Sequence, residues 1–485
     1  MNSKDLKTKR RIVVLLTALI LLFLALIVYL SYFMFFKAED IKGHPANRRS
    51  AIVENTIKRG SIYDRNGELL TYSEGEPGNY QRHSNYPTLY SHLIGYTHQS
   101  LGNSGLEASF NDFLLNRNGN RSLKELSDSL NKKDEKLGNN LILTVDTKVQ
   151  AKARELLQDR AEKGSVVLLN PKTGEIYAMV SLPDFNVMTI SEDWESIQKN
   201  KDGALLNRAL NGKYPPGSTF KIITSAALLE DGDIPLSYED TGSQVINGRE
   251  FNNAGNAAYG SIGIKEAFAQ SSNAYYVSKG VDLGKNKLGA MADKFMFNQE
   301  IPFDHKVSRS IFDYKSSIDD TKLAASAIGQ GDVLATPLNM AMVAGAIGNH
   351  GAMQKPILVR RVENPNKTTI WYNDPEVLSQ AVPEEIAEEI KNLMIRVVNS
   401  GTGTNAQSND FQLAGKTGTA ENATGQSHAW FVGFAPAEDP YLAVAVILEQ
   451  ANESGNKAAA PIAKELMEYA YYQIEEDPIE EGEDQ

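Results

Sequence analysis

The stretch around which this chain is organised reads Tyr214-Pro215-Pro216-Gly217-Ser218-Thr219-Phe220-Lys221, and an apolar run, Ile222 to Leu229, follows it directly. The two prolines and the glycine end any helix or strand that precedes them, so the sequence predicts that a new helix begins at Ser218. Because the run after Lys221 is apolar almost all round, we expect this helix to be buried. Ser218 and Lys221 lie three residues apart and therefore share one helical face.

The position of Lys221 disfavours a charge on its amine. The helix dipole opposes an extra positive charge in the first turn, and burial lowers the pKa of the amine in the same direction. A neutral amine beside a hydroxyl can accept its proton, which is the arrangement of an activated serine nucleophile. The spacing alone is not specific, since Ser196 and Lys199 repeat it in a polar context that we interpret as a solvated surface turn.

Two later motifs make the pattern specific. Ser271-Ser272-Asn273 follows the first motif, and Lys416-Thr417-Gly418-Thr419 comes last. Ser-x-x-Lys, a Ser-x-Asn triplet and Lys-Thr-Gly, in this order, resemble the trio of the penicillin-binding proteins. On these residues the chain is similar to a class B penicillin-binding protein of the compact penicillin-binding protein A type. Members of that family are membrane-anchored peptidoglycan D,D-transpeptidases that β-lactams inhibit.

The resemblance implies a role for each motif residue. Ser218 would attack the carbonyl between the two D-alanines of a stem peptide, with Lys221 as the general base. Ser271 would pass a proton to the departing D-alanine, and Asn273 would hold the substrate amide. The backbone N–H groups of Ser218 and Thr419 would bind the oxyanion. The strand of the third motif would supply Lys416 as a further catalytic residue. Thr417, Gly418 and Thr419 on the same strand would bind the substrate, whose terminal carboxylate suits Lys416, Thr417 and Thr419.

Several alternatives stay open at this level. A D,D-carboxypeptidase would pass the acyl group to water instead of to a second stem peptide, and a β-lactam-binding scaffold or sensor would share the serine chemistry. Ser271 and Asn273 could instead cap a helix. His428 is expected to be a strand residue near the rim of the site rather than a base. Three other motif copies are expected to be surface turns or loops: Lys172-Thr173-Gly174, Ser129 to Asn131 and Ser454 to Asn456.

Composition narrows the class of protein further. The 485 residues carry a formal net charge of −12, which implies no basic face and argues against nucleic acid as a partner. The absence of cysteine excludes disulfides, thiolate metal sites and a cysteine nucleophile. The seven histidines are scattered and form no His-Glu-x-x-His motif. We therefore expect neither a metal nor a cofactor.

The N-terminus has the pattern of a membrane anchor. A cluster of basic residues in 1–11 precedes an uncharged run at 12–36, which is long enough to span the roughly 30 Å hydrocarbon core. A cleaved signal would need a shorter apolar core and a small-x-small site, and 31–36 offers none. The basic cluster should stay cytoplasmic, which predicts a single-pass protein of the cell membrane with everything after Lys37 outside.

Residues 37–140 read as a small β-rich domain. Asp64-Arg65-Asn66-Gly67 between apolar runs predicts a hairpin. Arg59 to Gly67 and Ser104 to Glu107 resemble signatures of the non-catalytic, dimerisation-type pedestal of class B proteins, so we expect no catalytic residue there. About a hundred residues cannot hold a glycosyltransferase as well. The resemblance therefore implies a separate membrane glycan polymerase, of the shape, elongation, division and sporulation class, as a partner.

Residues 141–474 are expected to form the transpeptidase domain, followed by an acidic, disordered tail at 475–485. The fold implied by the resemblance is α+β, with a five-stranded antiparallel sheet flanked by helices and an all-helical subdomain. Local patterns predict strands and helices at the two ends of this domain. The expected strands are 141–146, 165–169, 175–180, 414–420, 428–434 and 441–448, and the expected helices are 148–159, 339–347 and 458–472.

Overall fold

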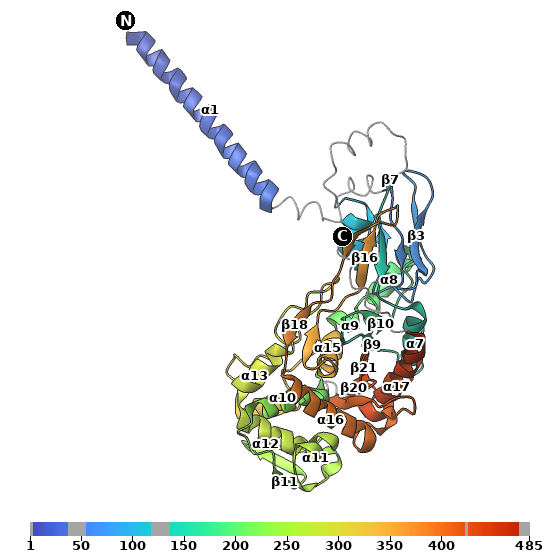
Figure 1. The fold of residues 1–485 in the computed structure, drawn as a ribbon. Coiled ribbons are helices and arrows are strands. Elements are labelled where there is room, and N and C mark those ends of the chain that lie inside the picture. The colour runs from blue at the N-terminus through green and yellow to red at the C-terminus, as the bar shows by residue number, and fades with distance from the viewer. Residues whose placement is uncertain (1–2, 37–54, 118–135, 422–424, 475–485) are drawn as a thin grey trace.

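The largest sheet of the protein has five strands. A computed structural model describes residues 3–36, 55–117, 136–421 and 425–474 (Figure 1). All neighbouring strands of this sheet are antiparallel, in the order β10-β9-β21-β20-β19, which confirms the predicted sheet. The strands are β9 Gly164–Leu169, β10 Ile176–Leu182, β19 Ala414–Glu421, β20 Ser427–Ala435 and β21 Leu442–Leu448.

Helices cover both faces of this sheet, which explains why its inner strands are apolar throughout. Successive side chains of a strand point to opposite faces. In β9, Val166 and Leu168 pack in one apolar cluster with residues of α7 and α17, while Val167 and Leu169 pack in another with residues of α15. The three helices are α7 Thr147–Gln158, α15 Pro337–Gly348 and α17 Gly455–Gln473, in agreement with the predicted helices.

A helical subdomain with two short hairpin-like sheets lies at the lower end of the molecule in Figure 1. Its strands pair as β11 with β14 and as β12 with β13. Its helices are α10 Lys221–Asp231, α11 Ile264–Ala269, α12 Asn273–Leu283, α13 Lys285–Lys294 and α14 Asp320–Ala327. A further helix, α16 Glu384–Ser400, packs against α10 and α11 on one side and against β19 on the other. The strands are β11 Tyr238–Asp240, β12 Ser243–Ile246, β13 Arg249–Asn252 and β14 Gly260–Ile262. The first two motifs of the sequence belong to this subdomain.

The pedestal is built on a six-stranded sheet with the order β17-β16-β8-β2-β3-β4. The predicted hairpin is confirmed, since β2 and β3 pair in antiparallel register around the Asn-Gly turn. The sheet also includes β16 and β17, which lie within 141–474 and come back to the pedestal after α15. Its strands are β2 Ile62–Tyr63, β3 Leu69–Glu74, β4 Gln81–Ser84, β8 Asn140–Leu143, β16 Val359–Glu363 and β17 Thr369–Tyr372.

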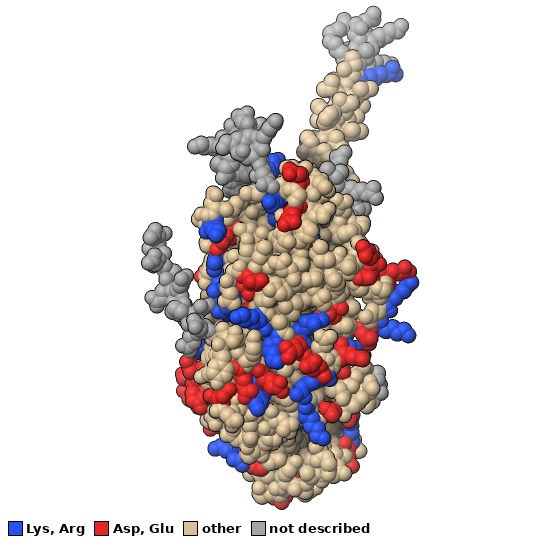
Figure 2. Space-filling view, turned by 90° about the vertical axis from the view of Figure 1, so that its right-hand side faces the viewer, with Lys and Arg blue, Asp and Glu red and all other residues tan. Residues whose placement is uncertain are grey.

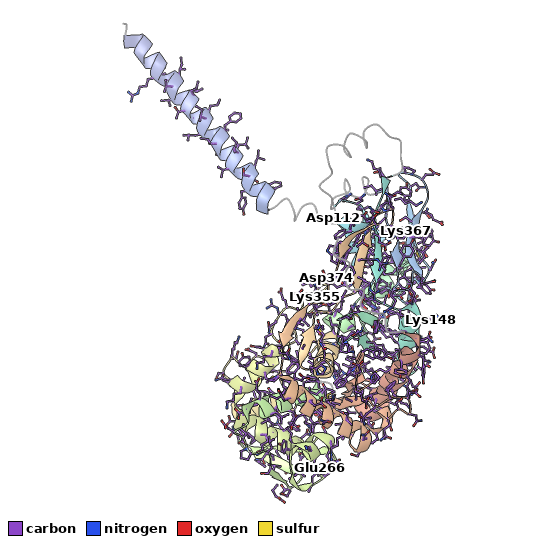
Figure 3. The ribbon with its side chains drawn as sticks, viewed as in Figure 1. Asp112, Lys148, Glu266, Lys355, Lys367 and Asp374 are labelled. Carbon is purple, nitrogen blue, oxygen red and sulfur yellow. The ribbon has the colours of Figure 1, made fainter. Side chains whose placement is uncertain are left out.

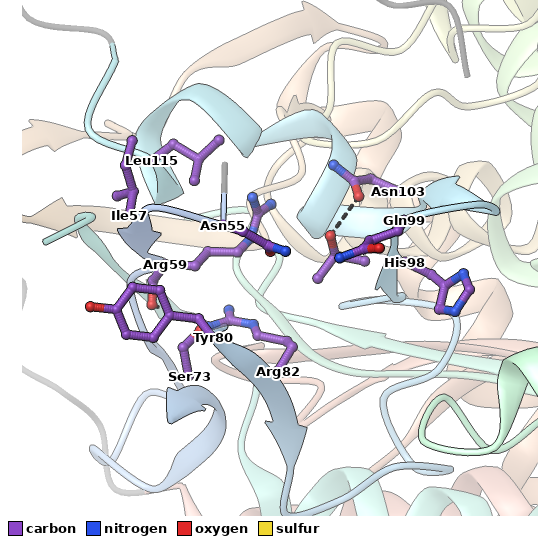
Figure 4. A pocket seen from close by; sticks show the side chains of 11 residues that line it. Asn55, Ile57, Arg59, Ser73, Tyr80, Arg82, His98, Gln99, Asn103 and Leu115 are labelled. Atoms are coloured by element: carbon purple, nitrogen blue, oxygen red, sulfur yellow. Dashed lines mark hydrogen bonds between the residues drawn. The ribbon is translucent and has the colours of Figure 1, made fainter. Parts of the chain in front are cut away.

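The two pedestal signatures meet in a buried ion cluster. Glu107 accepts hydrogen bonds from Arg59 and, at 2.7 Å, from Arg82, and it is 1% exposed. Burial alone would raise the pKa of Glu107, but the two guanidinium groups hold it below its ordinary value. A hollow opens beside the cluster, and Arg59 and Arg82 line it together with Tyr80 and Asn103 (Figure 4). The signatures thus stabilise the pedestal.

The pedestal and the helical subdomain lie at opposite ends of the molecule. Figure 3 places Asp112 and Lys367 at the pedestal end and Glu266, on α11, at the other end. On the face shown in Figure 2, basic and acidic side chains interleave in a band across the middle. At the N-terminus, helix α1 (Ser3–Phe36) contains a 24-residue stretch, Arg10–Phe33, that is long and apolar enough to cross a membrane.

Candidate active site

The first motif lies at the start of a buried helix, as predicted, but the first turn is not α-helical. Residues Gly217–Phe220 form a 3-10 turn, and α10 begins at Lys221. Gly217 has φ +54°, and its N–H donates to the Gly329 carbonyl at 2.9 Å. The Thr219 hydroxyl donates to the Pro216 carbonyl at 2.7 Å and closes the tight turn. These contacts hold Ser218, which is half-buried, one turn ahead of Lys221.

Lys221 connects the first motif to the second. Its side chain is 0% exposed, and its Nζ donates to the Ser271 carbonyl at 2.7 Å, to Ser271 Oγ at 3.1 Å and to Asn273 Oδ1 at 2.8 Å. Among the residues that the structure describes, the Ser218 hydroxyl has no hydrogen-bond partner. It is therefore available to a substrate, whereas Lys221 is held in place by three acceptors.

Lys416 brings the third motif to the same oxygen. It lies on β19, is 0% exposed, and donates to Ser271 Oγ at 3.0 Å and to the Thr417 carbonyl at 3.2 Å. The Ser271 hydroxyl oxygen therefore accepts from Lys221 and Lys416 at once, and its own hydrogen can be donated elsewhere. Three distant segments therefore meet at this one atom, since Lys221 and Lys416 lie 50 and 145 positions from Ser271 in the sequence.

The two lysines have no carboxylate between them. Neither forms an ion pair with an Asp or Glu of the described residues, and their acceptors are neutral oxygens. Burial, and then the charge of Lys416, lower the pKa of Lys221 well below its ordinary value. Burial lowers the pKa of Lys416 to about 7. The rings of Tyr276 and Phe268 lie 5.3 and 5.5 Å from the Nζ atoms of Lys221 and Lys416, and their faces attract an ammonium group only weakly. Because no described carboxylate pairs with either lysine, the site favours an incoming anion.

The second motif has an unusual backbone. Ser271 follows α11 with φ +57°, a left-handed conformation that is uncommon for a residue with a Cβ. The cap of α12 is Ser272, whose Oγ accepts from the Tyr275 N–H at 3.0 Å, and Asn273 is the first residue of that helix. The alternative in which Ser271 or Asn273 caps the helix is therefore wrong, and both side chains are left for Lys221.

The third motif packs closely against the nucleophile turn. A Cβ added to Gly418 would lie 2.9 Å from the Pro216 carbonyl oxygen, and one added to Gly217 would lie 2.8 Å from the Thr419 carbonyl oxygen. Thr419 is exposed on the edge strand, while Thr417 is 7% exposed and its Oγ1 lies 2.9 Å from Thr402 Oγ1. The two glycines thus let the edge strand and the turn lie side by side at an opening to solvent.

The other motif copies lie elsewhere. Lys172 is in the turn between β9 and β10, where it pairs with Asp439 at 2.6 Å and has 42% of its side chain exposed. Ser196 and Lys199 are exposed as predicted, but the interpretation as a turn is wrong, because they lie in helix α8 (Ile190–Lys199). This helix is supported by the ion pair between Lys199 and Glu195.

The remaining alternatives are placed as follows. His428 is a buried residue of β20, and its Nδ1 accepts from the Gln450 N–H at 3.2 Å. Ser454 is exposed and precedes α17, but Gly455 and Asn456 are the first two residues of that helix, so the interpretation of Ser454 to Asn456 as a loop is wrong for these two. The triplet Ser129 to Asn131 and the acidic tail 475–485 lie outside the described residues. Within the described ranges, no group of three or more His, Asp or Glu side chains is arranged to hold a metal ion.

Sequence reasoning missed several residues that contact the motifs. Thr402 contacts Thr417, and Asp240 and Asn253 both contact Ser272. No local pattern marks these residues, because each reaches its motif through tertiary structure.

Comparisons with known proteins agree with this geometry. Residues 164–468 match the family model of the penicillin binding protein transpeptidase domain, and residues 59–141 match that of the penicillin binding protein A dimerisation domain. The chain is 34% identical over 486 residues to the peptidoglycan D,D-transpeptidase PbpA of Mycolicibacterium smegmatis, covering 94% of this chain and 97% of the relative.

Solved structures give the same result. An imipenem acyl-enzyme complex of penicillin-binding protein A from M. tuberculosis has a TM-score of 0.80 at 29% identity, with 86% of this chain and all (100%) of that chain covered. The D,D-transpeptidase domain of a peptidoglycan glycosyltransferase from Eggerthella lenta has a TM-score of 0.77 at 34% identity, with 86% and 99% covered.

Proposed function

The chain belongs to the class B penicillin-binding protein transpeptidases and is a peptidoglycan D,D-transpeptidase, and we propose that Ser218 forms its acyl-enzyme. The observation that carries the proposal is the convergence of Lys221 and Lys416 on Ser271 Oγ, with Lys221 one turn after Ser218 along the chain. It combines a nucleophile, a buried amine with a lowered pKa and a hydroxyl that can relay protons, which are the parts that acyl transfer needs.

In the acylation step, Ser218 Oγ attacks the carbonyl carbon between the two D-alanines. Its proton passes to Lys221, because burial and then the charge of Lys416 lower the pKa of this amine and favour its neutral form. The backbone N–H groups of Ser218 and Thr419 bind the oxyanion, and a donor of this kind is worth roughly 10²–10³ in rate. Ser271 then donates its hydroxyl hydrogen to the departing amine and is reprotonated by a lysine, so the C–N bond breaks and D-alanine leaves.

The third motif is proposed to bind the terminal carboxylate of the donor peptide. Lys416 contributes positive charge that no described Asp or Glu neutralises, and Thr417 and Thr419 contribute hydroxyl groups along the edge strand. Gly418 lets the strand approach the nucleophile turn. Asn273, oriented by Lys221 at 2.8 Å, holds the substrate amide. A carboxylate in this position interacts favourably with the charged form of Lys416, so recognition and electrostatics favour the same substrate.

In the second half of the reaction, the amine of another stem peptide attacks the acyl-enzyme. The attacking amine gives up one proton, which passes through Ser271 and Lys221 to Ser218 Oγ, so the ester bond to Ser218 breaks as the amide bond forms. A β-lactam imitates the acyl donor and keeps its leaving group attached, so Ser218 stays acylated. Solved structures of penicillin-binding protein A from M. tuberculosis include imipenem and penicillin G acyl-enzyme complexes of that protein.

Mass spectrometry tests the nucleophile. After the detergent-solubilised full chain is treated with penicillin G, the adduct should lie on the peptide that contains Ser218, and Ser218→Ala should abolish it. Ser196→Ala is the matched control, because Ser196 has the same spacing to a lysine on an exposed helix. An adduct on Ser196, or an adduct that survives Ser218→Ala, contradicts the assignment.

The membrane topology and the polymerase partner belong to the same proposal. The apolar helix α1 anchors the chain once, the basic cluster in 1–11 stays cytoplasmic, and the pedestal (37–140) and transpeptidase domain (141–474) lie outside. A protease added to intact cells should digest the chain beyond Lys37 and spare a tag at Met1. Release of a soluble form that lacks residues 12–36 contradicts a permanent anchor.

The partner is proposed to be a membrane glycan polymerase of the shape, elongation, division and sporulation class. The two matched regions, 59–141 and 164–468, are described as dimerisation and transpeptidase domains, so nascent strands must come from another protein. Such a polymerase should co-purify from detergent, and replacing residues 12–36 by an unrelated span should weaken the association. If no polymerase is recovered and the enzyme only releases D-alanine from natural substrates, these results favour the alternative function, that of a D,D-carboxypeptidase.

A further inference from the structure

One carboxylate outside the three motifs reaches the second motif directly. Asp240 ends β11 and is 1% exposed. Its Oδ2 accepts from Ser272 Oγ at 2.5 Å and from Asn253 Nδ2 at 3.0 Å. Its Oδ1 accepts from Asn253 Nδ2 at 2.8 Å and from the Gly242 N–H at 2.9 Å. Both oxygens are therefore occupied, and the hydrogen bonds to a charged acceptor are stronger than neutral ones.

The two side chains that Asp240 holds are themselves attached to the start of α12. Ser272 Oγ accepts from the Tyr275 N–H at 3.0 Å, and Asn253 Oδ1 accepts from the Ala274 N–H at 3.0 Å. Ser272 is 0% exposed and Asn253 is 3% exposed, so water does not compete for these bonds. The first backbone N–H groups of the helix are thus fixed to β11 and to the segment that follows β13.

Ser271 lies between this fixed point and the end of α11. Its φ of +57° costs about 1–2 kcal/mol for a residue with a Cβ, and such a conformation persists only where its surroundings impose it. The Ser272 N–H donates to the Ala267 carbonyl at 2.9 Å, while the Ser272 side chain is held by Asp240. Because the peptide is held on both sides, the carbonyl and Oγ of Ser271 both face Lys221.

We infer that Asp240 is a positioning residue, which acts through Ser272 and Asn253 to hold Ser271 in the left-handed conformation where its hydroxyl meets both lysines. The inference rests on the proposed roles of Ser218 and Ser271. Asp240 itself touches neither the nucleophile nor a lysine in the described contacts. Its loss should therefore misplace the relay hydroxyl without removing any group that reacts.

The test measures acylation of the full-length chain in detergent with a fluorescent penicillin. Asp240→Asn keeps the shape of the side chain but replaces one carboxylate oxygen by an NH₂ group, which cannot accept a hydrogen bond. Ser272 and Asn253 therefore lose part of the hydrogen bonding that holds them. We expect the second-order acylation rate to fall about tenfold to a hundredfold, since a displacement of about 1 Å can cost 10²-fold. Ser272→Ala should also slow acylation, and it keeps the inference testable if Asp240→Asn folds poorly.

A matched control separates positioning from stability. Asp304 is another Asp whose Oδ2 accepts two backbone N–H groups, from Leu358 at 2.8 Å and Val359 at 2.9 Å, but it contacts no motif residue. Asp304→Asn should lower the melting temperature and leave acylation of the folded protein within about twofold of wild type. If both Asp variants slow acylation equally at the same loss of stability, Asp240 has a merely structural role and the inference is overturned.

A double-mutant cycle then tests the route. If Asp240 acts through Ser271, Asp240→Asn should have little further effect in a Ser271→Ala background, whereas independent effects would multiply. The charge-exchanged pair Asp240→Asn with Asn253→Asp restores a carboxylate to the cluster and should recover part of the rate. If Ser271→Ala leaves acylation unchanged, the proposed function of Ser271 fails. If Ser271→Ala slows acylation and Asp240→Asn and Ser272→Ala do not, only the present inference fails.

Discussion

Replacing Lys416 by methionine should make the protein more stable while it destroys the carboxylate site. Lys416→Met keeps the length and the volume of the side chain and removes its charge. The pKa of Lys416 is about 7 in the folded chain, because burial opposes the charge, against an ordinary value of 10.5. A difference of about 3.5 units corresponds to at most about 5 kcal/mol of destabilisation when the lysine is charged in both states.

The hydrogen bonds of Lys416 offset part of this gain. Ser271 Oγ and the Thr417 carbonyl each lose a donor in Lys416→Met, at about 1 kcal/mol each. Below pH 7 the penalty of the charged lysine is fully present, so the variant should be more stable by about 2 kcal/mol or somewhat more. Between pH 7 and 10.5 the folded lysine is neutral while the unfolded one is still charged. The penalty therefore shrinks as pH rises, and near pH 9 the two proteins should be about equal.

Equilibrium urea unfolding of the full-length chain in detergent measures this difference, with the fluorescence of the buried Trp430 as a probe. The free energy of unfolding is compared for wild type and Lys416→Met at pH 6 and pH 9. Lys172→Met is the control, since Lys172 lies in an exposed Lys-Thr-Gly turn and its replacement should change stability little at either pH. A variant that is less stable than wild type at pH 6, or a gap that does not narrow by pH 9, refutes the reasoning.

Four further substitutions, in two matched pairs, test the choice of motif and the packing. Lys172→Ala should leave fluorescent-penicillin acylation within about twofold of wild type, whereas Lys416→Ala should slow it by about a hundredfold or more, because only the latter contacts the relay hydroxyl; equal effects would contradict this choice. Gly329→Ala should destabilise the chain by about 2–4 kcal/mol in thermal unfolding, since its φ is +71° and a Cβ would lie 2.1 Å from the Gly217 carbonyl oxygen. In Gly331→Ala, with φ +70° and the nearest atom at 3.6 Å, the loss should be only about 1 kcal/mol; a loss as large as that of Gly329→Ala would argue against the close contact.

Much of the fold could be predicted because its signals are local. The strands of the central sheet are short apolar runs bounded by turns, and three of them, β19, β20 and β21, are consecutive in sequence. The buried helix after the first motif follows from an apolar segment behind Pro-Pro-Gly. The Asn-Gly turn between β2 and β3 has a residue with φ +83°, Gly67, which is the conformation that such a hairpin requires.

The pedestal could not be predicted fully, because it is assembled from distant segments. Strand β16 pairs with β17 on one side and, on the other, with β8, which lies more than 200 residues earlier in the chain. Their sequence shows an ordinary hairpin, and nothing in it indicates which sheet the hairpin joins. The ion cluster of Arg59, Arg82 and Glu107 likewise depends on tertiary contacts, although Arg59 and Glu107 belong to recognisable signatures.

The same limit applies to the site, where chemistry and positioning fall on neighbouring residues. In Ser271-Ser272, one serine faces the two lysines and the other caps α12, and the sequence alone allows either order. The left-handed φ of Ser271 decides between them, and it is imposed by Asp240, 31 positions before Ser271, and by α11. The residue types of a motif therefore indicate which reaction a site supports, whereas the conformation that makes the reaction efficient depends on polar side chains that carry no motif. Substitutions at such positions should change acylation without changing any residue by which the family is recognised.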